Sequence, residues 1–312
     1  MPIDRAELRV PAALALGAVY TREVRVGVDR IWENVLDWEH LPALHEIFFS
    51  DVALVEIGNW GWRVELTRAA GAAGRRIVVE LRIDREKARY CVRTLAGEGA
   101  GTEIWTLLEA LGPHRTAIEA RFYLPEHGPD RLAALGEKYR SSHARLWNQD
   151  EAMMMRRDAL SARRRTRRKV SATPLALGPL CEVRQRLPLL VEVDGEPFRL
   201  LELEDGSLVA HGTICPHWLG PLEDAVQENG RLRCPWHGYL FDVRTGMSAD
   251  GRGYRLAPAP LDVVEKNLVH CWQVLPIEHV FPNSIDPDPD LAGRWRRARE
   301  RQRFPDRQDR SA

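Results

Sequence analysis

Two short motifs of cysteine and histidine constrain this chain more than any other feature. Cys215-x-His217 and Cys234-x2-His237 are separated by sixteen residues, so four metal-binding side chains fall on two short segments. Two thiolates and two imidazoles can hold a [2Fe–2S] cluster, with the cysteines on one iron and the histidines on the other. A zinc site with the same ligands is the alternative. Either centre requires a fold that brings the two segments together as adjacent loops.

The residues around both motifs favour the cluster. CPHWLGPL and CPWHGYLFDVRTG resemble the Rieske family over its metal-binding subdomain, which implies a [2Fe–2S] cluster on the four ligands named above. Trp218 departs from the family, where a basic residue is common, and can alter docking or hydrogen bonding near the cluster. Gly220 and Trp236 stand where cytochrome-complex members carry disulfide-forming cysteines. The cluster therefore resembles the lower-potential ferredoxin and oxygenase branch.

The composition is that of a globular protein. The 312 residues are 44% hydrophobic, which is enough for two ordinary domains. Basic and acidic residues number 45 each, so a formal net charge of zero argues against nucleic acid or another polyanionic partner. Five cysteines are few and odd in number for a disulfide framework, which fits a reducing compartment. We expect Cys91, Cys181 and Cys271 to be small buried apolar residues.

No segment is expected to cross a membrane. The apolar stretch from Val10 to Val19 could pass for a weak signal sequence, but it contains Pro11 and continues into TREVRVGV, which alternates like a strand. Nowhere does an apolar run approach the roughly 18 residues of a membrane span. We therefore expect a soluble, cytoplasmic protein.

The first half of the chain is predicted to form an α+β domain. Strand-like runs fill residues 18–124, interrupted by a helical segment at 29–49 that Asp29 is expected to cap. A long helix follows from Pro129 to about Arg164. This order resembles the helix-grip fold of START-like ligand-binding proteins, in which an antiparallel sheet wraps the last helix around an apolar cavity.

Four segments are expected along the chain. They are a START-like catalytic domain at 1–165, a basic linker at 166–176, a mostly β Rieske domain at 177–282 and a charged tail at 283–312. Residues 162–174 are dense in cations, and we favour a solvated linker over a docking surface because charge runs usually stay hydrated.

A second metal site is predicted in the first domain. Glu33, Asp37, His40 and His45 follow the spacing Glu-x3-Asp-x2-His-x4-His, which resembles the segment around the mononuclear iron of Rieske oxygenases. The resemblance implies that His40 and His45 ligate iron, and that Asp37 relays an electron from a cluster histidine. Glu33 has a supporting role at most. Two surface histidines on a polar helix face are the alternative.

The spacing of these histidines excludes a straight helix. Residues five apart on a regular helix point about 140° away from each other. Pro42 lies between His40 and His45, so we expect the helix to break at Leu41 and the two imidazoles to converge.

Asp150 is the candidate for the carboxylate that completes such a site, since non-haem iron oxygenases bind Fe(II) with two histidines and one carboxylate. It lies about 40° from Leu146 on the long helix, near Met153 and Met154, where an unpaired carboxylate would be costly. Its position also resembles the acidic ligand that family members carry on their last catalytic helix. Glu151 is the rival but should face away.

Other residues near this helix have two interpretations each. His143 shares the side of Asp150 and either lines the pocket or is an ordinary core histidine, which we favour. Four tryptophans could form an apolar substrate wall, although aromatic residues at such spacing are more often core: Trp60, Trp62, Trp105 and Trp147.

Together the two sites resemble a Rieske non-haem iron oxygenase, of the type of the alpha-subunits that hydroxylate aromatic rings, across most of residues 18–277. The resemblance implies a mono- or dioxygenase that passes electrons from the [2Fe–2S] cluster to a mononuclear non-haem Fe(II), where O2 is activated. The implied reaction is hydroxylation or demethylation of a small apolar substrate, for example an aromatic or polycyclic one. An external reductase or ferredoxin would supply the electrons, since the chain shows no flavin or nicotinamide fingerprint.

One departure from the family is large. The Rieske domain comes first in the familiar oxygenases but second here, which puts the usual homotrimer in doubt and leaves electron transfer within or between chains open. The competing hypothesis is a non-catalytic START-like ligand-binding protein fused to a Rieske ferredoxin. It would hold about two irons per chain instead of about three.

Overall fold

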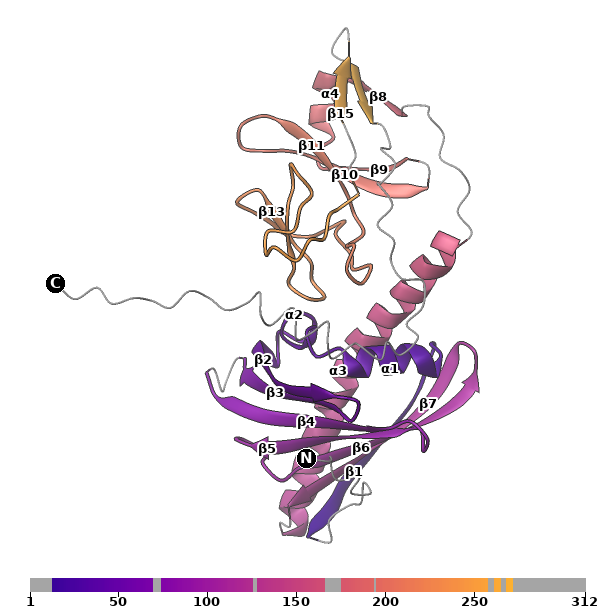
Figure 1. Cartoon of the computed structure of the whole chain (residues 1–312), viewed down its shortest axis with the longest axis vertical. Helices are drawn as coiled ribbons and strands as arrows, with labels where there is room; N and C mark the ends of the chain where they lie inside the picture. The colour runs from indigo at the N-terminus through magenta and orange to yellow at the C-terminus, as the bar shows by residue number, and fades with distance from the viewer. Residues whose placement is uncertain are drawn as a thin grey trace, which may run out of the picture.

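The computed structural model describes residues 13–69, 74–125, 128–165, 175–193, 195–257, 261–264 and 268–271. They form an N-terminal domain and a C-terminal domain, with a long helix that reaches from the first toward the second (Figure 1). The charged tail at 283–312 and most of the expected linker lie outside the described residues. Among the described residues, no helix is long and apolar enough to span a membrane.

Seven antiparallel strands build the sheet of the N-terminal domain, in the order β1-β7-β6-β5-β4-β3-β2. Each strand from β2 to β7 therefore pairs with its neighbour in sequence, and β1 closes on β7. The strands are β1 (Leu14–Val24), β2 (Phe49–Gly58), β3 (Gly61–Arg68), β4 (Arg76–Asp84), β5 (Arg89–Ala96), β6 (Glu103–Gly112) and β7 (Arg115–Pro125). The apolar residues from Leu14 to Val19 thus belong to the first strand.

The helices of this domain are α1 (Val28–Leu36), α2 (Leu41–Leu44) and α3 (Pro129–Arg165). α3 packs against β1 and β7. A Cβ added to Gly136 would lie 2.2 Å from the carbonyl oxygen of Gly17, so this close approach of α3 to β1 requires glycine. An antiparallel sheet with a long terminal helix confirms the predicted α+β helix-grip fold.

The core of the N-terminal domain lies between one face of the sheet and the helices. Burial alternates along β7, as expected for a strand with one face in the core. The buried apolar residues come from several strands of the sheet and from the faces of α1 and α3 that pack against it. They include Val24, Ile31, Trp32, Val64, Leu81, Ile118, Trp147 and Met154.

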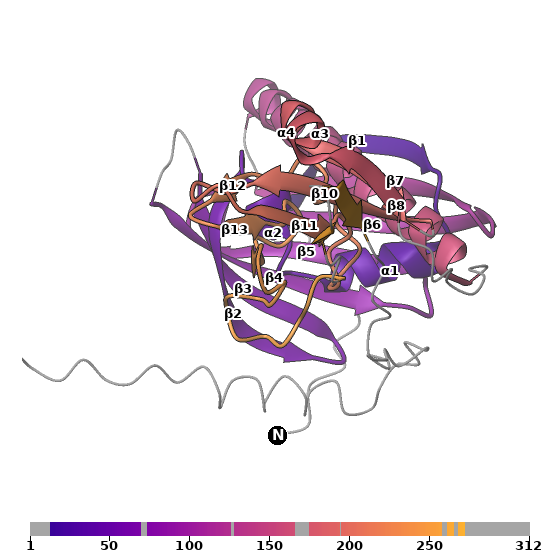
Figure 2. The same cartoon turned by 90° about the horizontal axis from the view of Figure 1, so that it is seen from above.

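The C-terminal domain is mostly β and carries the cysteine–histidine motifs on its loops. Viewed from above, it covers α2 and part of the sheet (Figure 2). Three small sheets have the orders β11-β10-β9, β12-β13-β14 and β15-β16-β8. Their elements are β8 (Leu175–Pro179), α4 (Leu180–Gln185), β9 (Leu189–Val193), β10 (Glu196–Glu202), β11 (Leu208–Gly212), β12 (Gln227–Glu228), β13 (Arg231–Arg233), β14 (Leu240–Asp242), β15 (Leu261–Val264) and β16 (Leu268–Cys271).

Two expectations about the first helical segment are wrong. Gly27 occupies the N-cap position of α1, and Asp29 lies in the first turn, where an acidic residue also interacts well with the helix dipole. The break falls after Leu36, upstream of the predicted position at Leu41. Pro42 instead lies in the first turn of α2, where a missing N–H costs nothing.

The expected burial of the remaining cysteines holds only in part. Cys91 is buried, whereas Cys181 is exposed. Val183 is the buried residue of α4, and residues two apart on a helix point about 200° apart, so Cys181 faces away from the core. The burial of Cys271 lies outside what the structure describes.

Candidate metal centres

The two cysteine–histidine motifs lie on loops with the same backbone conformation. The first loop follows β11, and the second connects β13 to β14. In each, the cysteine N–H donates to the carbonyl five residues ahead, at 2.9 and 2.8 Å, and the residue four ahead donates back to the cysteine carbonyl, at 3.0 and 2.9 Å. That residue has a left-handed backbone in both loops: Leu219 (φ 64) and Gly238 (φ 70). The repeated turn directs both pairs of predicted ligands to one place.

The metal-binding atoms of these loops fit a cluster. Nδ1 of His217 and Nδ1 of His237 are buried without a hydrogen-bond partner among the described residues, and their ring centroids are 4.5 Å apart. The thiols of Cys215 and Cys234 are buried and interact with each other. A Cβ added to Gly220 would lie 2.7 Å from Sγ of Cys234, so glycine leaves the space that the sulfur occupies.

The protonation state of His217 also suits a ligand. Desolvation lowers the pKa of this imidazole to about 3. It is therefore neutral at pH 7, the form in which histidine binds metals. Two buried thiols and two orphaned imidazole nitrogens are the donor set of a [2Fe–2S] cluster with mixed ligands.

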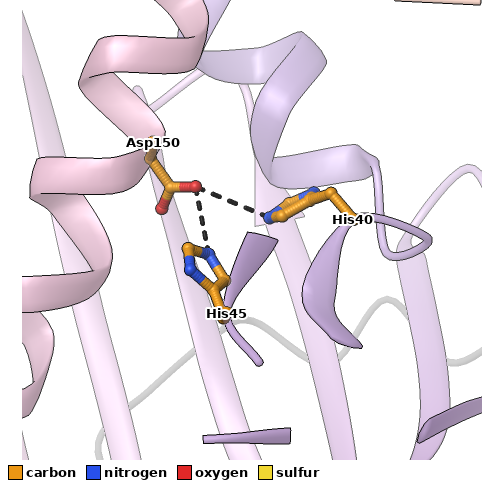
Figure 3. A group of neighbouring side chains, drawn as sticks. All are labelled: His40, His45 and Asp150. Atoms are coloured by element: carbon orange, nitrogen blue, oxygen red, sulfur yellow. Dashed lines mark ion pairs between the residues drawn. The ribbon is translucent and has the colours of Figure 1, made fainter. Parts of the chain in front are cut away.

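The N-terminal domain brings His40, His45 and Asp150 together, and all three are buried (Figure 3). Oδ1 of Asp150 lies 3.1 Å from Nε2 of His45 and 3.6 Å from Nε2 of His40. One potential ligand atom from each residue lies within 4.8 Å of the others. The histidines flank α2 and the aspartate projects from α3. The break after α1 and the short turn of α2 let the imidazoles converge, whereas one straight helix would separate them.

The surroundings of the three side chains leave their facing atoms free. Nδ1 of His45 lies 2.9 Å from Oε1 of Gln149, so it can donate a proton there and keep the Nε2 lone pair for a metal. Asn34 hydrogen-bonds Asp150. Oδ1 of Asp150 is buried, and its close contacts are with the Nε2 atoms of the two imidazoles. A buried carboxylate oxygen that faces two imidazole nitrogens is the pattern expected of a metal site.

The charge of Asp150 follows from the same contacts. Desolvation by itself would raise the pKa of this carboxyl group, but its contacts with His45, His40 and Asn34 outweigh desolvation, so the pKa is lowered. Asp150 is thus an anion at neutral pH. Ligation of iron by these three residues stays a prediction.

The alternatives near Asp150 are placed elsewhere. Glu151 forms ion pairs with Arg22 of β1 and with Arg25, which follows that strand. His143 accepts a hydrogen bond from Trp147 at 2.9 Å and packs edge-on against Phe122, as the core interpretation expects. Desolvation lowers the pKa of His143 to about 4, so it is neutral at pH 7.

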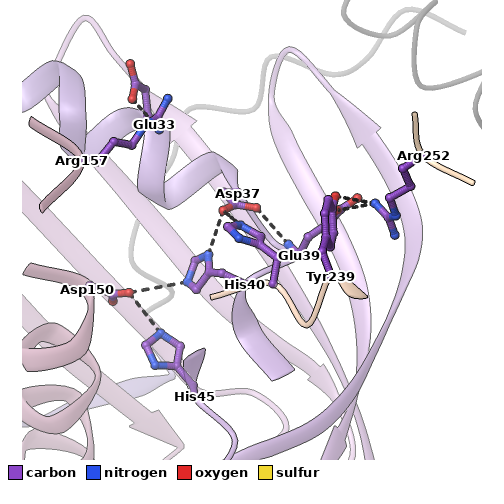
Figure 4. A network of polar contacts seen from close by, with 10 residues as sticks. Glu33, Asp37, Glu39, His40, His45, Asp150, Arg157, Tyr239 and Arg252 are labelled. Atoms are coloured by element: carbon purple, nitrogen blue, oxygen red, sulfur yellow. Dashed lines mark hydrogen bonds and ion pairs between the residues drawn. The ribbon is translucent and has the colours of Figure 1, made fainter. Parts of the chain in front are cut away.

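Asp37 connects the two candidate centres within one chain (Figure 4). Its Oδ2 lies 2.6 Å from Nε2 of His237 and 3.3 Å from Nδ1 of His40. Its Oδ1 accepts a hydrogen bond of 3.1 Å from the backbone N–H of Glu39, which orients the carboxylate. Desolvation opposes ionisation, yet His237 and His40 lower the pKa of Asp37 well below its usual range. A charged carboxylate therefore touches one histidine of each predicted site.

The other residues selected from the sequence have structural contacts. Glu33 forms an ion pair with Arg157 at 2.8 Å, away from the three converging side chains. Trp62 and Trp147 belong to the core of the N-terminal domain, and the guanidinium of Arg63 lies over the ring of Trp60.

Sequence reasoning missed the partners that orient the predicted site residues. Gln149 holds His45, and Tyr239 donates a hydrogen bond to Glu39 at 2.6 Å. A metal-ligating histidine nearly always donates its second nitrogen to some acceptor, so the need for a residue such as Gln149 was foreseeable. Its identity was not, because 104 residues separate the pair.

Comparison with protein families identifies the C-terminal domain. Residues 173–258 match the Rieske [2Fe-2S] domain family. Apoptosis-inducing factor 3 of Mus musculus is 44% identical over 54 residues, which are 17% of this chain and 9% of the relative. The oxygenase component of dicamba O-demethylase from Stenotrophomonas maltophilia is 39% identical over 67 residues, which are 22% of this chain and 20% of the relative. The chain thus matches only a small part of the length of these relatives.

Among solved structures, the Zhui aromatase/cyclase from a Streptomyces strain aligns with 45% of this chain and 93% of its own, at 16% identity and a TM-score of 0.38.

The family match covers both loops that carry the cysteine–histidine motifs. Taken with the paired loops and their donor atoms, it shows that this chain contains a Rieske [2Fe–2S] domain.

Proposed function

We propose that this chain is the oxygenase component of a Rieske non-haem iron system. The observation that carries the proposal is Asp37, whose carboxylate contacts His237 of the Rieske domain at 2.6 Å and His40 of the N-terminal domain at 3.3 Å. A ligand-binding domain that merely accompanied a ferredoxin would have no need for a buried carboxylate between two imidazoles. The relative from Stenotrophomonas maltophilia, which is an oxygenase component, supports the proposal over the 67 residues that match.

The proposed cluster ligands are two buried thiols and two imidazole nitrogens that have no hydrogen-bond partner among the described residues. Cys215 and Cys234 would bind the cluster through Sγ, and His217 and His237 through Nδ1, which leaves Nε2 of His237 to donate to Asp37. When bound, the cluster supplies single electrons and a mononuclear iron supplies dioxygen activation.

The N-terminal site would hold that iron through two imidazoles and one carboxylate. Nε2 of His40, Nε2 of His45 and Oδ1 of Asp150 face one another. Gln149 would keep the proton of His45 on Nδ1, because its amide oxygen lies 2.9 Å from that nitrogen. Oδ2 of Asp37 lies 3.3 Å from Nδ1 of His40, so this imidazole also has a carboxylate beside its second nitrogen.

The substrate and the electron donor follow from the surroundings of the site. The three converging side chains lie in the N-terminal domain, whose main core cluster is formed by apolar residues and includes Met154 of α3, with Leu41 of α2 packed against it. A small apolar molecule is therefore the proposed substrate, and hydroxylation or demethylation the proposed outcome. An external reductase or ferredoxin would deliver the electrons.

Iron analysis tests the proposal. Anaerobically purified protein should hold about three irons per chain. Asp150→Ala and His45→Ala should each remove about one iron while the visible spectrum of the cluster is preserved. Asp130→Asn, which changes an exposed aspartate in the first turn of the same helix, is the matched control and should retain all three.

The competing function makes a different prediction. A ligand carrier fused to a ferredoxin would hold about two irons in wild type and in every variant. That result, together with no oxygen consumption when the cluster is reduced, would contradict the oxygenase proposal.

A further inference from the structure

The Rieske domain rests on the N-terminal domain of the same chain through an apolar contact. Met153 of α3 is 2% exposed and packs in the hydrophobic cluster of the Rieske domain, next to residues of both motif loops. Leu44 of α2 packs against the same cluster. Arg156 adds a two-point ion pair with Glu223 of the Rieske domain, at 2.7 and 3.0 Å. The contact thus joins α2 and α3 to the segment around the first loop.

Beside this apolar contact, an arginine is enclosed between the domains. The guanidinium of Arg157 lies 3.8 Å from the ring centroid of Trp218, in the first motif loop, and its Nη1 is 2.8 Å from Glu33. We call Glu33, Arg157 and Trp218 the arginine clamp. Desolvation lowers the pKa of Arg157 to about 10, so the group stays charged at neutral pH. Cation–π contacts are strongest for such partly desolvated cations over tryptophan.

A second group of side chains joins the domains close to Asp37. Tyr239 donates to Oε2 of Glu39 at 2.6 Å, and Arg252 donates to the same oxygen at 3.0 Å. The guanidinium of Arg252 also lies 4.2 Å from the ring centroid of Tyr239. We call Glu39, Tyr239 and Arg252 the tyrosine clamp. The ring of Tyr239 stacks on His217 at 4.4 Å, so this clamp reaches the cluster loops directly.

We propose that His237 and Asp37 of one and the same chain form the electron relay, and that the two clamps hold them in contact. The inference rests on the proposed function and goes further, because it makes a single chain sufficient. One electron from an external one-electron donor, such as a reduced ferredoxin, would pass from the cluster held by the Rieske loops to the metal held by His40, His45 and Asp150. No covalent bond forms or breaks in this step, and dioxygen is the final acceptor.

Tethering explains why the contact would persist in a single chain. Two domains of one chain meet at an effective concentration set by their connection and not by the protein concentration. A contact between separate chains weakens on dilution instead. Concentration dependence therefore distinguishes the two arrangements.

Hydrogen–deuterium exchange of the metallated full chain measures the contact without reference to activity. Protection of residues 36–45 and 234–239 should be unchanged over about a hundredfold dilution. Arg157→Met should accelerate exchange in both segments about tenfold. Tyr239→Phe, which keeps the ring but removes the hydroxyl, should act in the same direction. Arg140→Met, on an exposed face of the same helix, is the control and should change neither segment. Loss of protection in the wild type on dilution would overturn the inference.

A redox readout separates the role of the clamps from a merely structural one. The midpoint potential of the cluster in Arg157→Met and in Tyr239→Phe should shift in the same direction as in Asp37→Asn. Unchanged potentials in both clamp variants would show that the clamps do not hold His237 on Asp37.

Mixing two defective variants tests whether the electron can cross between chains. Cys234→Ser should lack the cluster, and Asp150→Ala should lack the third iron. Co-expressed, they should consume no more oxygen than either alone. Restored consumption would show transfer between chains and overturn this inference while leaving the proposed function intact. A wild type that lacks the third iron would instead contradict the proposed function, and the exchange experiment would still decide whether the contact lies within one chain.

Discussion

Replacing Asp37 with asparagine should raise the reduction potential of the cluster. The substitution keeps the shape of the side chain but removes a negative charge 2.6 Å from Nε2 of His237. The lowered pKa of Asp37 means that this charge is present at neutral pH. A negative charge beside a cluster ligand favours the oxidised, more positive state, so its removal favours reduction.

The size of the shift follows from the hydrogen bond that changes. A hydrogen bond to a charged group contributes about 1.5–3 kcal/mol and a neutral one about 0.5–1.5 kcal/mol, so the substitution weakens the contact by about 1–1.5 kcal/mol. For a one-electron couple, about 1.4 kcal/mol corresponds to about 59 mV. Only the part of this energy that differs between the two oxidation states counts, so the expected rise is about 20–60 mV.

Anaerobic redox titration followed by visible absorbance measures this shift. Cluster content must be equal in both proteins, which iron and sulfide analysis establishes. Asp205→Asn removes a charge from an exposed residue of the same domain and should change the potential by less than about 10 mV, because exposed charges are screened. A potential that is unchanged or lower in Asp37→Asn would refute the coupling of Asp37 to the cluster.

Two further predictions concern the fold and the second site. Gly136→Ala should lower the free energy of unfolding by about 1–3 kcal/mol, because the new Cβ would meet the carbonyl oxygen of Gly17. This cost outweighs the gain in helix propensity of about 1 kcal/mol. Thermal unfolding followed by circular dichroism measures the change, and a more stable variant would contradict the close packing. Gln149→Leu should weaken binding of iron at the N-terminal site about 10–100-fold, because the proton on Nδ1 of His45 loses its acceptor. Competition with a chromophoric chelator measures the affinity. Wild-type affinity in the variant would argue against a ligand role for His45.

Patterns that act over a few residues could be predicted from the sequence. The spacing of Cys215, His217, Cys234 and His237 indicated a Rieske domain, which the family match confirms. Alternation of apolar residues and the long helix after Pro129 predicted the helix-grip fold, which the sheet order confirms. The position of Asp150 on the apolar side of its helix predicted that it lies near His40 and His45, and the structure brings the three together.

Local errors arose where two positions satisfy the same rule. An acidic residue is favourable both at an N-cap and in the first turn, so composition could not decide between Gly27 and Asp29 as the cap. Pro42 disfavours helix at the preceding residue but is also well tolerated in a first turn, and the second effect prevails in α2.

The sequence by itself determined which side chains could bind metal and on which elements they lie, because ligand type, spacing and helical face are properties of neighbouring residues. Only the tertiary structure decided that Asp37 meets His237, which lies 200 residues further along the same chain. It also decided that Arg157 meets Trp218. Such contacts depend on the packing of two domains and on the register of many strands, and no local pattern encodes the sum of those small interactions.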